Sequence, residues 1–503
     1  MAAFVIAFFG LTLLLILRLR QKPSLPLPPG PKGKPIIGNL GDLPPPDTPE
    51  YKHWLQLRDR YGPINSITTL GQTIIILHDA RMAVDLLEKR SSVYSSRPRL
   101  VFAGEIIGWN DVLALQPYNG RFRAYRKALH QVLGTKALVS KFNPLQELEA
   151  RRFLQRLLDD SENLVQHIRT EAGAIILQIA YGYTINPDGH DPLVKMANEA
   201  MESFSTAGSP GMWLVDTIPA LKYLPSWFPF AKFQRLGRTW RTQLLTTVET
   251  PYQLVREKMA NGTQTPSYLS SLLNKEKPLT EEEEFIAKWT SVALFTGGSD
   301  TSVSTLMTFF LAMALNPDVQ TKAQEELDRV LGPYTLPCAS DRPRLPYINA
   351  IVKESLRWCP VAPMGLPHLC TEEDEYEGYR IPKGAIVMQN IWSFTHNPTT
   401  YPEPDRFNPE RFLGETPQAD PAEVVFGFGR RICPGRVLAD SSIFMTVAMV
   451  LAMMRISPEE GMGGKSGVEL TPGVVSQPVL PRGGVRVVAR SKQHEEVVRG
   501  DAR

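Results

Sequence analysis

The sequence has little of what several common classes of protein require. Its 503 residues include only four cysteines and no C-x-x-C spacing, so neither a disulfide scaffold nor a zinc ribbon is expected. The formal net charge of +3 is too small to indicate a nucleic-acid-binding protein. No internal repeat and no long low-complexity linker divides the chain. The composition, 43% hydrophobic and 21% charged, is that of a globular protein with a large core.

Two glycine-rich stretches fail as nucleotide-binding loops. After Gly427-x-Gly429, Ile432 occupies the position of the third glycine of a dinucleotide-binding loop. Before residues 463–466, Gly-Gly-Lys-Ser, Glu459 stands where a phosphate-binding loop has its first glycine. The chain therefore shows no module for a flavin or a nicotinamide. Electrons for a redox reaction must come from a separate protein.

Cys433 lies in a glycine-rich loop, residues 426–436, that contains three arginines and precedes a long apolar run. Two glycines in this loop allow tight turns that other residues rarely make. Pro434 and Gly435 open the next helix, so Cys433 sits at a helix N-terminus, where free N–H groups and the helix dipole favour an anion. We expect a thiolate that binds a metal; an inert buried cysteine is the alternative.

This loop resembles the haem-binding signature of the cytochrome P-450 superfamily. The resemblance is carried by Phe426, Gly429, Arg431, Cys433 and Gly435. It implies a mainly α fold with a small β region, in which a triangular helical domain holds haem b beneath a long central helix. It also implies that Cys433 is the axial ligand of the haem iron and that Phe426, Arg431 and Gly435 contact the cofactor.

A long helix is predicted to begin at a capping box, residues 280–283, and to end before Pro317. Residues 297–301 in its middle read Gly-Gly-Ser-Asp-Thr, and each glycine inside a helix costs about 1 kcal/mol relative to alanine. We expect them to let the backbone distort and another group approach. The stretch resembles the family's Ala/Gly-Gly-x-Asp/Glu-Thr motif, which implies that Asp300 and Thr301 deliver protons for oxygen activation. A polar kink in a buried helix is the alternative.

Glu354 and Arg357 are three residues apart on a predicted amphipathic helix, residues 347–358, and can form an ion pair. Most such pairs lie at the surface and contribute under about 1 kcal/mol. In the resembled family the pair is buried and is joined by an arginine of a later loop, here Arg411. The resemblance implies that these residues stabilise the fold and have no chemical role.

Three cationic residues match family positions that bind haem propionates: Arg126, His368 and Arg431. Next to Arg126 the family usually has Trp-Arg-x-x-Arg-Lys, and here Phe122 replaces the tryptophan. One N–H donor to a propionate is therefore missing. A solvated helix face is the alternative for Arg126, and a purely structural role is the alternative for His368.

The two ends of the chain differ in composition from its bulk. Uncharged, mostly apolar residues followed at once by basic ones predict a transmembrane signal anchor over residues 1–22, with its basic end in the cytosol. A cleaved signal peptide would need a basic start and a small-residue cleavage site, and both are missing. Residues 23–35 form a proline-rich hinge, 36–490 a single catalytic haem domain, and 491–503 a charged tail expected to be disordered. The expected location is the endoplasmic reticulum membrane, single-pass, with the catalytic domain cytosolic.

Five further segments carry structural predictions. Residues 66–77 predict two short strands around a glycine turn, and residues 376–387 predict a hairpin. Residues 101–115 predict an irregular loop, which in the family lines the substrate pocket, and 472–478 predict a turn at the pocket edge. Aromatic residues and prolines within 201–235 suit a substrate-access lid that faces a membrane, or ordinary core.

The resemblance, which covers nearly the whole chain, implies a haem b monooxygenase that inserts one atom of O2 into its substrate, and the apolar pocket segments predict a lipophilic small molecule. By resemblance, electrons come from NADPH through a membrane-bound NADPH–cytochrome reductase. The reductase would dock on a basic face, which could equally be a solvated surface, formed by Arg123, Lys127, Arg430 and Arg436. The chain looks like fungal family members that act in secondary metabolism or xenobiotic oxidation. A haem-thiolate hydroperoxide isomerase or dehydratase and a non-enzymatic haem sensor are the alternatives, and the intact acid–alcohol pair argues against both.

Overall fold

The structure is a computed structural model that describes residues 25–45, 48–186, 191–209, 212–229, 231–459, 468–480 and 484–500. The predicted transmembrane anchor lies outside these residues. Helices make up most of the described chain, so the expected mainly α fold with a small β region is confirmed. The longer helices are α2 (Glu50–Tyr61), α5 (Gly120–Leu133), α7 (Asn143–Asp159), α8 (Leu164–Tyr181), α9 (Pro192–Ala207), α11 (Lys232–Ala260), α12 (Tyr268–Leu273), α13 (Glu281–Leu315), α14 (Pro317–Leu331), α15 (Pro346–Trp358), α18 (Arg436–Met453) and α19 (Lys492–Gly500).

Three small sheets complete the described part of the fold. The largest has the order β1-β2-β6-β3, and its strands are β1 (Ile64–Thr69), β2 (Gln72–Leu77), β6 (Ile386–Gln389) and β3 (His368–Leu369). The other two are the antiparallel pairs β4 (Asp374–Tyr376) with β5 (Tyr379–Ile381), and β7 (Met454–Pro458) with β8 (Val485–Ala489). The two strands predicted in residues 66–77 are confirmed.

The hairpin predicted over residues 376–387 is wrong in its second half. β5 pairs with β4, which precedes it, whereas β6 runs parallel to β2 and places Ile386 opposite Ile74. The reason is burial, because Ile75 and Val387 are both fully buried where the two strands meet. A hairpin partner for β6 would leave these side chains exposed.

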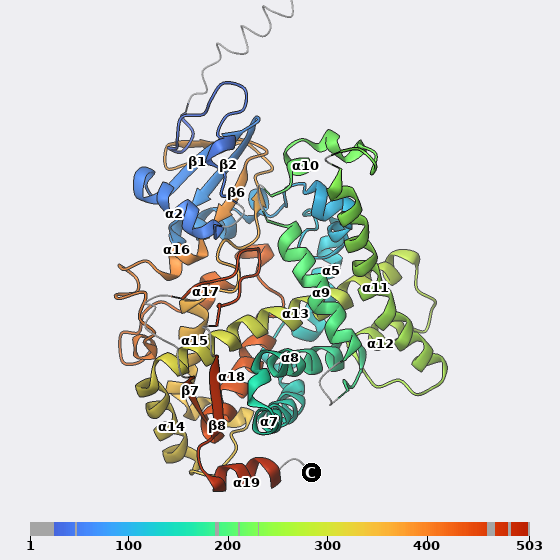
Figure 1. Cartoon of the computed structure of the whole chain (residues 1–503). Coiled ribbons are helices and arrows are strands. Elements are labelled where there is room, and N and C mark those ends of the chain that lie inside the picture. Colours follow the sequence, from blue (N-terminus) through green and yellow to red (C-terminus); the bar gives the residue numbers. More distant parts are fainter. Residues whose placement is uncertain are drawn as a thin grey trace, which may run out of the picture.

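Helix α13 passes through the middle of the molecule, between the sheet at one end and α19 at the other (Figure 1). Its predicted start is confirmed, because Thr280 Oγ1 accepts a hydrogen bond from the Glu283 N–H at 3.3 Å and the Glu283 carboxylate accepts one from the Thr280 N–H at 2.9 Å. The helix is continuous through both glycines, so the expected distortion does not interrupt it. Gly298 instead allows α8 to approach, since a Cβ there would lie 2.8 Å from Ile176 Cγ1.

Helix α18 follows the Cys433 loop and forms much of the core. Among the described helices it alone is long and apolar enough to cross a membrane, with a mean hydropathy of 1.6. Two-thirds of it is buried against other helices, including α13, α14 and α15. It is therefore a core helix, and it fixes the position of the loop that precedes it.

The described part of the proline-rich hinge, residues 25–35, is attached to two of the sheets. The Ser66 N–H donates to the Pro29 carbonyl at 3.0 Å, and the Arg380 N–H donates to the Pro26 carbonyl at 2.8 Å. Gly30 permits this contact, because a Cβ there would lie 1.8 Å from the Ser66 carbonyl oxygen. The segment is extended rather than helical, as predicted, and it is fixed to the domain.

The tail beyond residue 490 corrects the expectation of disorder over its described part. Residues 492–500 form α19, which packs against α7. His494 and Val498 are buried, and Arg499 pairs with Asp159 at 3.0 Å. The high charge of this segment lies on the exposed face of an amphipathic helix. Composition alone did not reveal that face.

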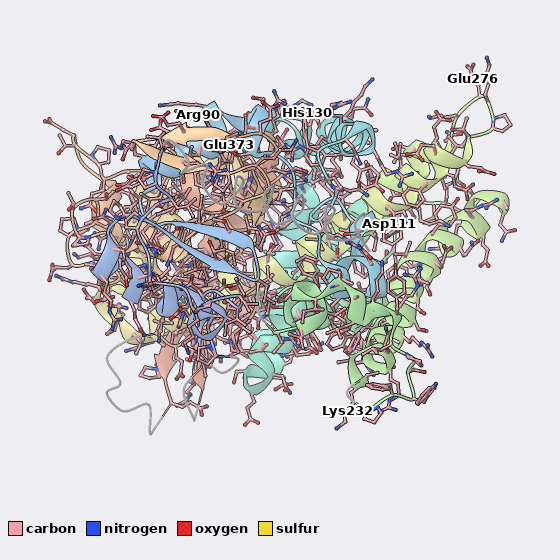
Figure 2. The ribbon with its side chains drawn as sticks, turned by 90° about the horizontal axis from the view of Figure 1, so that it is seen from above. Arg90, Asp111, His130, Lys232, Glu276 and Glu373 are labelled. Atoms are coloured by element: carbon pink, nitrogen blue, oxygen red, sulfur yellow. The ribbon has the colours of Figure 1, made fainter. Side chains whose placement is uncertain are left out.

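Residues 101–115 are also more ordered than predicted. Val101–Ile107 form a π-helix and Trp109–Asp111 a 3-10 turn. Figure 2 shows Asp111 of this turn within the body of the molecule, whereas Glu276, in the connection between α12 and α13, lies at the tip of a projection.

Arg90 and Glu373 lie close together at another edge of the molecule. There Arg90 pairs with Asp374, the residue next to Glu373, at 2.9 Å.

Candidate active site

A cavity of about 380 Å³ lies between α13 and the Cys433 loop. Thr301 of α13 and Cys433 both line it, as do apolar residues of α5, α8, α9 and α18. Both segments predicted to border a pocket also contribute, through Trp109 in one case and Val474 and Val475 in the other. The cavity is therefore an apolar space with a thiol on one wall and a hydroxyl on another.

The Cys433 loop is held by its own backbone and by close contact with the helical segment Val84–Lys89. The Cys433 N–H donates to the Phe426 carbonyl at 2.8 Å, which closes the loop. Gly429 has a φ of +49°, and a Cβ there would lie 2.7 Å from the Leu87 carbonyl oxygen, so no other residue fits. At Gly435 an added Cβ would have the Cys433 Sγ as its nearest neighbour, at 3.9 Å.

The environment of the Cys433 thiol contains opposing effects. Burial raises its pKa above the ordinary value, while N–H groups of Gly435 and Arg436 and the positive charge of Arg126 act to lower it. These donors are those expected at a helix N-terminus. A coordinated metal ion would decide the balance, because a thiol bound to a metal is deprotonated.

Three arginines border the same cavity, and none of them pairs with a carboxylate of the described residues. The titratable groups near Arg97, Arg126 and Arg431 within the described chain are one another, Cys433, Arg436, Tyr118 and His368. Burial lowers the pKa of all three guanidinium groups, in the case of Arg431 to about 9. Buried cations are normally paired, so this cluster lacks an anion.

The N–H groups of these arginines bind backbone carbonyls. Arg126 Nη1 donates to the Ile432 carbonyl at 2.6 Å, and Arg431 Nε donates to the Ser95 carbonyl at 2.6 Å. Arg97 Nη1 donates to the carbonyls of Leu366 and Pro367 at 2.8 and 2.6 Å. The cations thus join the Cys433 loop to segments far away in the sequence.

His368 lies beside them and is 2% exposed. Its Nδ1 is 2.7 Å from the Tyr94 carbonyl oxygen, so this nitrogen carries a proton. Burial and the charge of Arg97 hold the pKa of the imidazole well below its ordinary value, which leaves Nε2 as an acceptor. To donate to a propionate from Nε2, the ring must gain a second proton, and a bound carboxylate would favour that form.

Haem fits this arrangement on the chemistry of the donors. The apolar walls suit a flat macrocycle, the thiol suits its iron, and the unpaired arginines suit its two carboxylates. Phe426, Arg431 and Gly435 all line the cavity beside Cys433. The described residues contain no group of three or more His, Cys, Asp or Glu side chains that could hold a separate metal ion.

Asp300 and Thr301 are placed differently from one another. Thr301 lines the cavity, and its Oγ1 donates to the Gly297 carbonyl at 2.7 Å. Asp300 is 9% exposed and, among the described residues, does not line the cavity. Its Oδ1 accepts a hydrogen bond from Gln477 Nε2 at 2.8 Å. Burial raises the pKa of this carboxyl above its ordinary value.

Glu354, Arg357 and Arg411 meet in the interior, away from the cavity. Arg357 Nε is 2.7 Å from Glu354 Oε2, and Arg411 Nε is 3.1 Å from Glu354 Oε1. Arg357 Nη2 also donates to Glu354 Oε1 at 2.8 Å, and the Asn408 N–H adds a fourth hydrogen bond to the same carboxylate at 2.7 Å. The network ties α15 to the loop that follows residue 400, and no atom of it reaches the cavity wall.

The fold and this site together define a haem-thiolate oxidoreductase. A model of the family described as Cytochrome P450 matches residues 28–481, so the chain belongs to the cytochrome P450 family. The chain is a monooxygenase of this family, and the family implies a thiolate-bound haem, an organic substrate and O2.

Similar proteins span nearly the whole chain. The cytochrome P450 monooxygenase claR of Ampulloclitocybe clavipes is 46% identical over 479 residues, which cover 94% of this chain and 88% of that protein. O-methylsterigmatocystin oxidoreductase of Aspergillus flavus is 42% identical over 497 residues, 98% of this chain and 93% of that protein. The multifunctional cytochrome P450 monooxygenase af510 of Aspergillus fumigatus is 40% identical over 506 residues, 98% and 94%. The predicted resemblance to fungal family members is confirmed.

Sequence reasoning missed two residues of the site. Arg97 has no acidic neighbour in the sequence and gives no sign that it is buried beside Arg431. Gln477 lies in the turn predicted at the pocket edge, but nothing in the sequence pairs it with Asp300. Both contacts join segments far apart in the chain. They follow from the fold, which no local pattern contains.

Proposed function

We propose that this chain is a membrane-bound monooxygenase of fungal secondary metabolism that oxidises a lipophilic compound with electrons supplied by a separate NADPH-dependent reductase. In the balanced reaction, RH, O2, NADPH and one proton give ROH, water and NADP⁺. The observation that carries this proposal is that Cys433 and Thr301 line the same apolar cavity, which unpaired cations border. A hydrolase or a carrier would need no such combination.

Haem b is the proposed cofactor, with Cys433 as its axial ligand. When bound, it supplies the activation of O2 and the one-electron chemistry that no side chain here can supply. The thiolate of Cys433 would hold the haem iron, and a thiolate-bound haem would supply the chemistry that cleaves the O–O bond. Arg97, Arg126, Arg431 and His368 hold the two propionates by charge-assisted hydrogen bonds.

The proposed proton donors are Asp300 and Thr301. Because burial raises the pKa of the Asp300 carboxyl, this group binds a proton more readily than an ordinary aspartate. The Thr301 hydroxyl lines the cavity and can pass a proton from Asp300 to the reacting oxygen. The apolar walls keep other water away, so that protons arrive through this pair.

The substrate is proposed to be a lipophilic small molecule that fits above Cys433. Phe204, Leu294, Leu366 and Val475 supply part of an apolar wall that offers little to a charged ligand. Secondary metabolism is supported by the relatives, one of which is named for the oxidation of O-methylsterigmatocystin. Oxidation of xenobiotic compounds is the second proposed role, and it would use the same chemistry.

A location at the endoplasmic reticulum membrane, single-pass with the catalytic domain in the cytosol, is part of the proposal. Several large apolar side chains are exposed in two segments, and Ile36, Tyr223 and Trp227 are 92%, 78% and 77% exposed. Contact with lipid would cover them without another protein. Residues 1–22 would supply the anchor proposed from the sequence.

The reductase is proposed to dock near the thiolate. Arg123, Lys127, Arg430 and Arg436 are all exposed, and they belong to α5 and to the Cys433 loop and its following helix. Arg430 lies over the Tyr118 ring, 5.0 Å from its centre, and donates to its hydroxyl at 2.8 Å. An acidic partner surface would match this face.

The first test is the carbon monoxide difference spectrum of the reduced protein. We expect the strongly red-shifted Soret band of a thiolate-ligated haem in the wild type and its loss in Cys433→Ala. Cys359→Ala is the matched control, because Cys359 is buried but does not line the cavity, and it should keep the band. A histidine-type spectrum in the wild type would overturn the proposal.

A further inference from the structure

The proposed acid is held outside the cavity by a residue from the far end of the chain. Gln477 Nε2 donates to Asp300 Oδ1 at 2.8 Å. Thr301 and Ser302 line the cavity, whereas Asp300, one position earlier on α13, does not. In this state the carboxyl cannot deliver a proton to the cavity directly. A movement of the side chain must come first.

Gln477 belongs to a turn that is strongly restrained. Its N–H donates to Thr471 Oγ1 at 2.9 Å, and its carbonyl accepts from the Thr471 N–H at 2.9 Å. Ser304 Oγ on α13 donates to the Ser476 carbonyl at 2.7 Å. The turn therefore packs directly on the helix that carries Asp300. The hydrogen bonds of its backbone fix the position of Gln477 and so direct the side-chain amide toward Asp300.

The same turn forms part of the cavity wall. Val474 and Val475 line the cavity three and two residues before Gln477. Ser205 of α9 binds Val475 on both sides, through Val475 O at 3.2 Å and Val475 N at 3.3 Å. One short segment thus contacts the space where a substrate would lie and, at its other end, the carboxyl of Asp300.

Charged groups on the other side of Asp300 come from α8 and α9. Arg169 of α8 and Glu202 of α9 act on its carboxyl in opposite directions, and Gln477 faces it from the turn. Glu202 is exposed, whereas Arg169 is partly buried. The Asp300 carboxyl is therefore influenced by charged groups of α8 and α9, whereas the neighbouring Thr301 lines the cavity.

We propose that Gln477 is a positioning residue that holds the Asp300 carboxyl on its Arg169–Glu202 side and releases it toward Thr301 when a substrate presses on Val474 and Val475. In this proposal a substrate that fills the cavity would press on Val474 and Val475 and favour a displaced turn from which Gln477 no longer reaches the Asp300 carboxyl, so that its binding would shift the population. The turn makes proton delivery depend on the presence of substrate. This role rests on the proposed function, because it assigns regulation to the same acid.

The hydrogen bond from Gln477 has a definite electrostatic effect. It stabilises the ionised carboxylate and so acts to lower the pKa of Asp300, against the larger effect of burial, which raises it. Removal of one donor to a charged group should therefore raise this pKa by about 1 to 2 pH units. Neither Arg169 nor Glu202 is altered by such a change.

The first experiment measures this carboxyl without turnover. The infrared band of protonated Asp300, identified by its absence in Asp300→Asn, is titrated in the haem-containing wild type, Gln477→Ala and Gln477→Asn. Asparagine keeps the amide but is one methylene too short to reach, so both variants should titrate at higher pH than the wild type. Ser476→Ala, in the same turn, should titrate like the wild type. Equal titration in all four proteins would overturn the proposal.

The second experiment measures proton delivery in a single turnover. Each protein is reduced chemically, mixed with O2 in the absence of substrate, and followed by absorbance in H2O and D2O. In Gln477→Ala the oxidised spectrum should return about tenfold faster, because the acid is no longer restrained. With substrate bound, wild type and variant should agree to within about twofold. Unchanged substrate-free rates would overturn the gating role, whereas loss of the thiolate spectrum in the wild type would overturn the proposed function itself.

Discussion

The guanidinium carbon of Arg431 lies 3.9 Å from the centre of the Phe122 ring. Phe122 is 3% exposed and lines the cavity at the position where the family usually has tryptophan. The ring covers one face of the guanidinium, while the N–H edge still donates to the Ser95 and Gln116 carbonyls at 2.6 Å each. Phenylalanine therefore keeps the support beneath Arg431 and lacks only the indole N–H.

Restoring that N–H should strengthen haem binding. In Phe122→Trp we expect haem transfer to apomyoglobin to slow about tenfold, the effect of one hydrogen bond to a charged group, roughly 1.5 kcal/mol. Phe122→Ala should transfer haem faster, because it loses both the ring under Arg431 and its packing. Phe122→Leu is the control for packing alone. If tryptophan speeds transfer, the position does not face a propionate.

Arg97 should strengthen haem binding through hydrogen bonds to the carboxylates of the cofactor. The expected result is that Arg97→Leu loses haem at least tenfold faster, since charge-assisted hydrogen bonds contribute about 1.5–3 kcal/mol. Arg97 also holds the Leu366 and Pro367 carbonyls, so a purely structural effect must be separated. The wild type should prefer haem to its dimethyl ester, and the variant should show a weaker preference, because Arg126, Arg431 and His368 would still hold the carboxylates. An unchanged preference would mean that Arg97 acts only on the backbone.

The network at Glu354 should contribute to stability and not to chemistry. Glu354→Gln leaves two buried guanidinium groups short of a counter-charge and should lower the free energy of unfolding by about 3–5 kcal/mol. Glu403→Gln is the matched control, because its pair with Arg406 is exposed and 3.4 Å long and should contribute at most about 1 kcal/mol. Urea unfolding of the haem-containing proteins measures both. Similar losses in the two variants would contradict a special role for the buried pair.

Features that depend on neighbouring residues could be predicted from the sequence. The capping box at Thr280 specifies a helix start through groups three residues apart, and the structure has both of its hydrogen bonds. Glu354 and Arg357 likewise face one another because of helical spacing. In these cases the groups that interact lie within a few residues of one another. A pattern in the sequence is then sufficient to predict the contact.

Features that depend on distant pairing could not be predicted. Ile74 and Ile386 are paired although more than half of the chain separates them, and the sequence of neither strand specifies which strand it pairs with. The burial of Arg97 and the contact of Gln477 with Asp300 have the same origin. The order of α19 follows from its docking on α7, which composition does not encode. The Cys433 loop is the exception, because its glycines and N–H groups create the thiolate environment locally.

Two carboxylates join residues 101–115, the segment that borders the cavity, to the predicted lid. Asp216 Oδ1 of α10 (Leu214–Thr217) accepts hydrogen bonds from the N–H groups of Val101 and Phe102 at 2.6 and 2.8 Å. Phe102 also stacks on Trp213, with ring centres 3.8 Å apart. Glu105 pairs with Lys222 at 2.8 Å and adds a second link between the same two segments. If residues 201–235 act as the predicted lid, its opening would have to break these contacts.

We call the hydrogen bonds from Val101 and Phe102 to Asp216 the latch, and we expect it to hold more tightly at low pH. Burial raises the pKa of Asp216 from its ordinary value of 3.8 to about 6 in the closed form, whereas an opened, solvated carboxyl would return to the ordinary value. The closed form therefore binds the proton more strongly, and protonation favours closure. Between pH 7.5 and pH 5 the ratio of closed to open protein should rise about tenfold. The pKa of Glu105, held at about 2 by Arg99 and Lys222, keeps that carboxylate ionised throughout this range.

The binding rate of a neutral azole inhibitor, followed by absorbance, tests the latch. In the wild type the rate should fall by up to about tenfold from pH 7.5 to pH 5. Asp216→Asn cannot titrate and should lose this dependence, because an amide oxygen still accepts the two N–H bonds at every pH. Glu105→Gln removes the neighbouring ion pairs but leaves Asp216, so its rates should be higher throughout and still fall with acid. A wild-type rate that rises in acid would mean that protonation breaks the latch, and the sign of the coupling would be reversed.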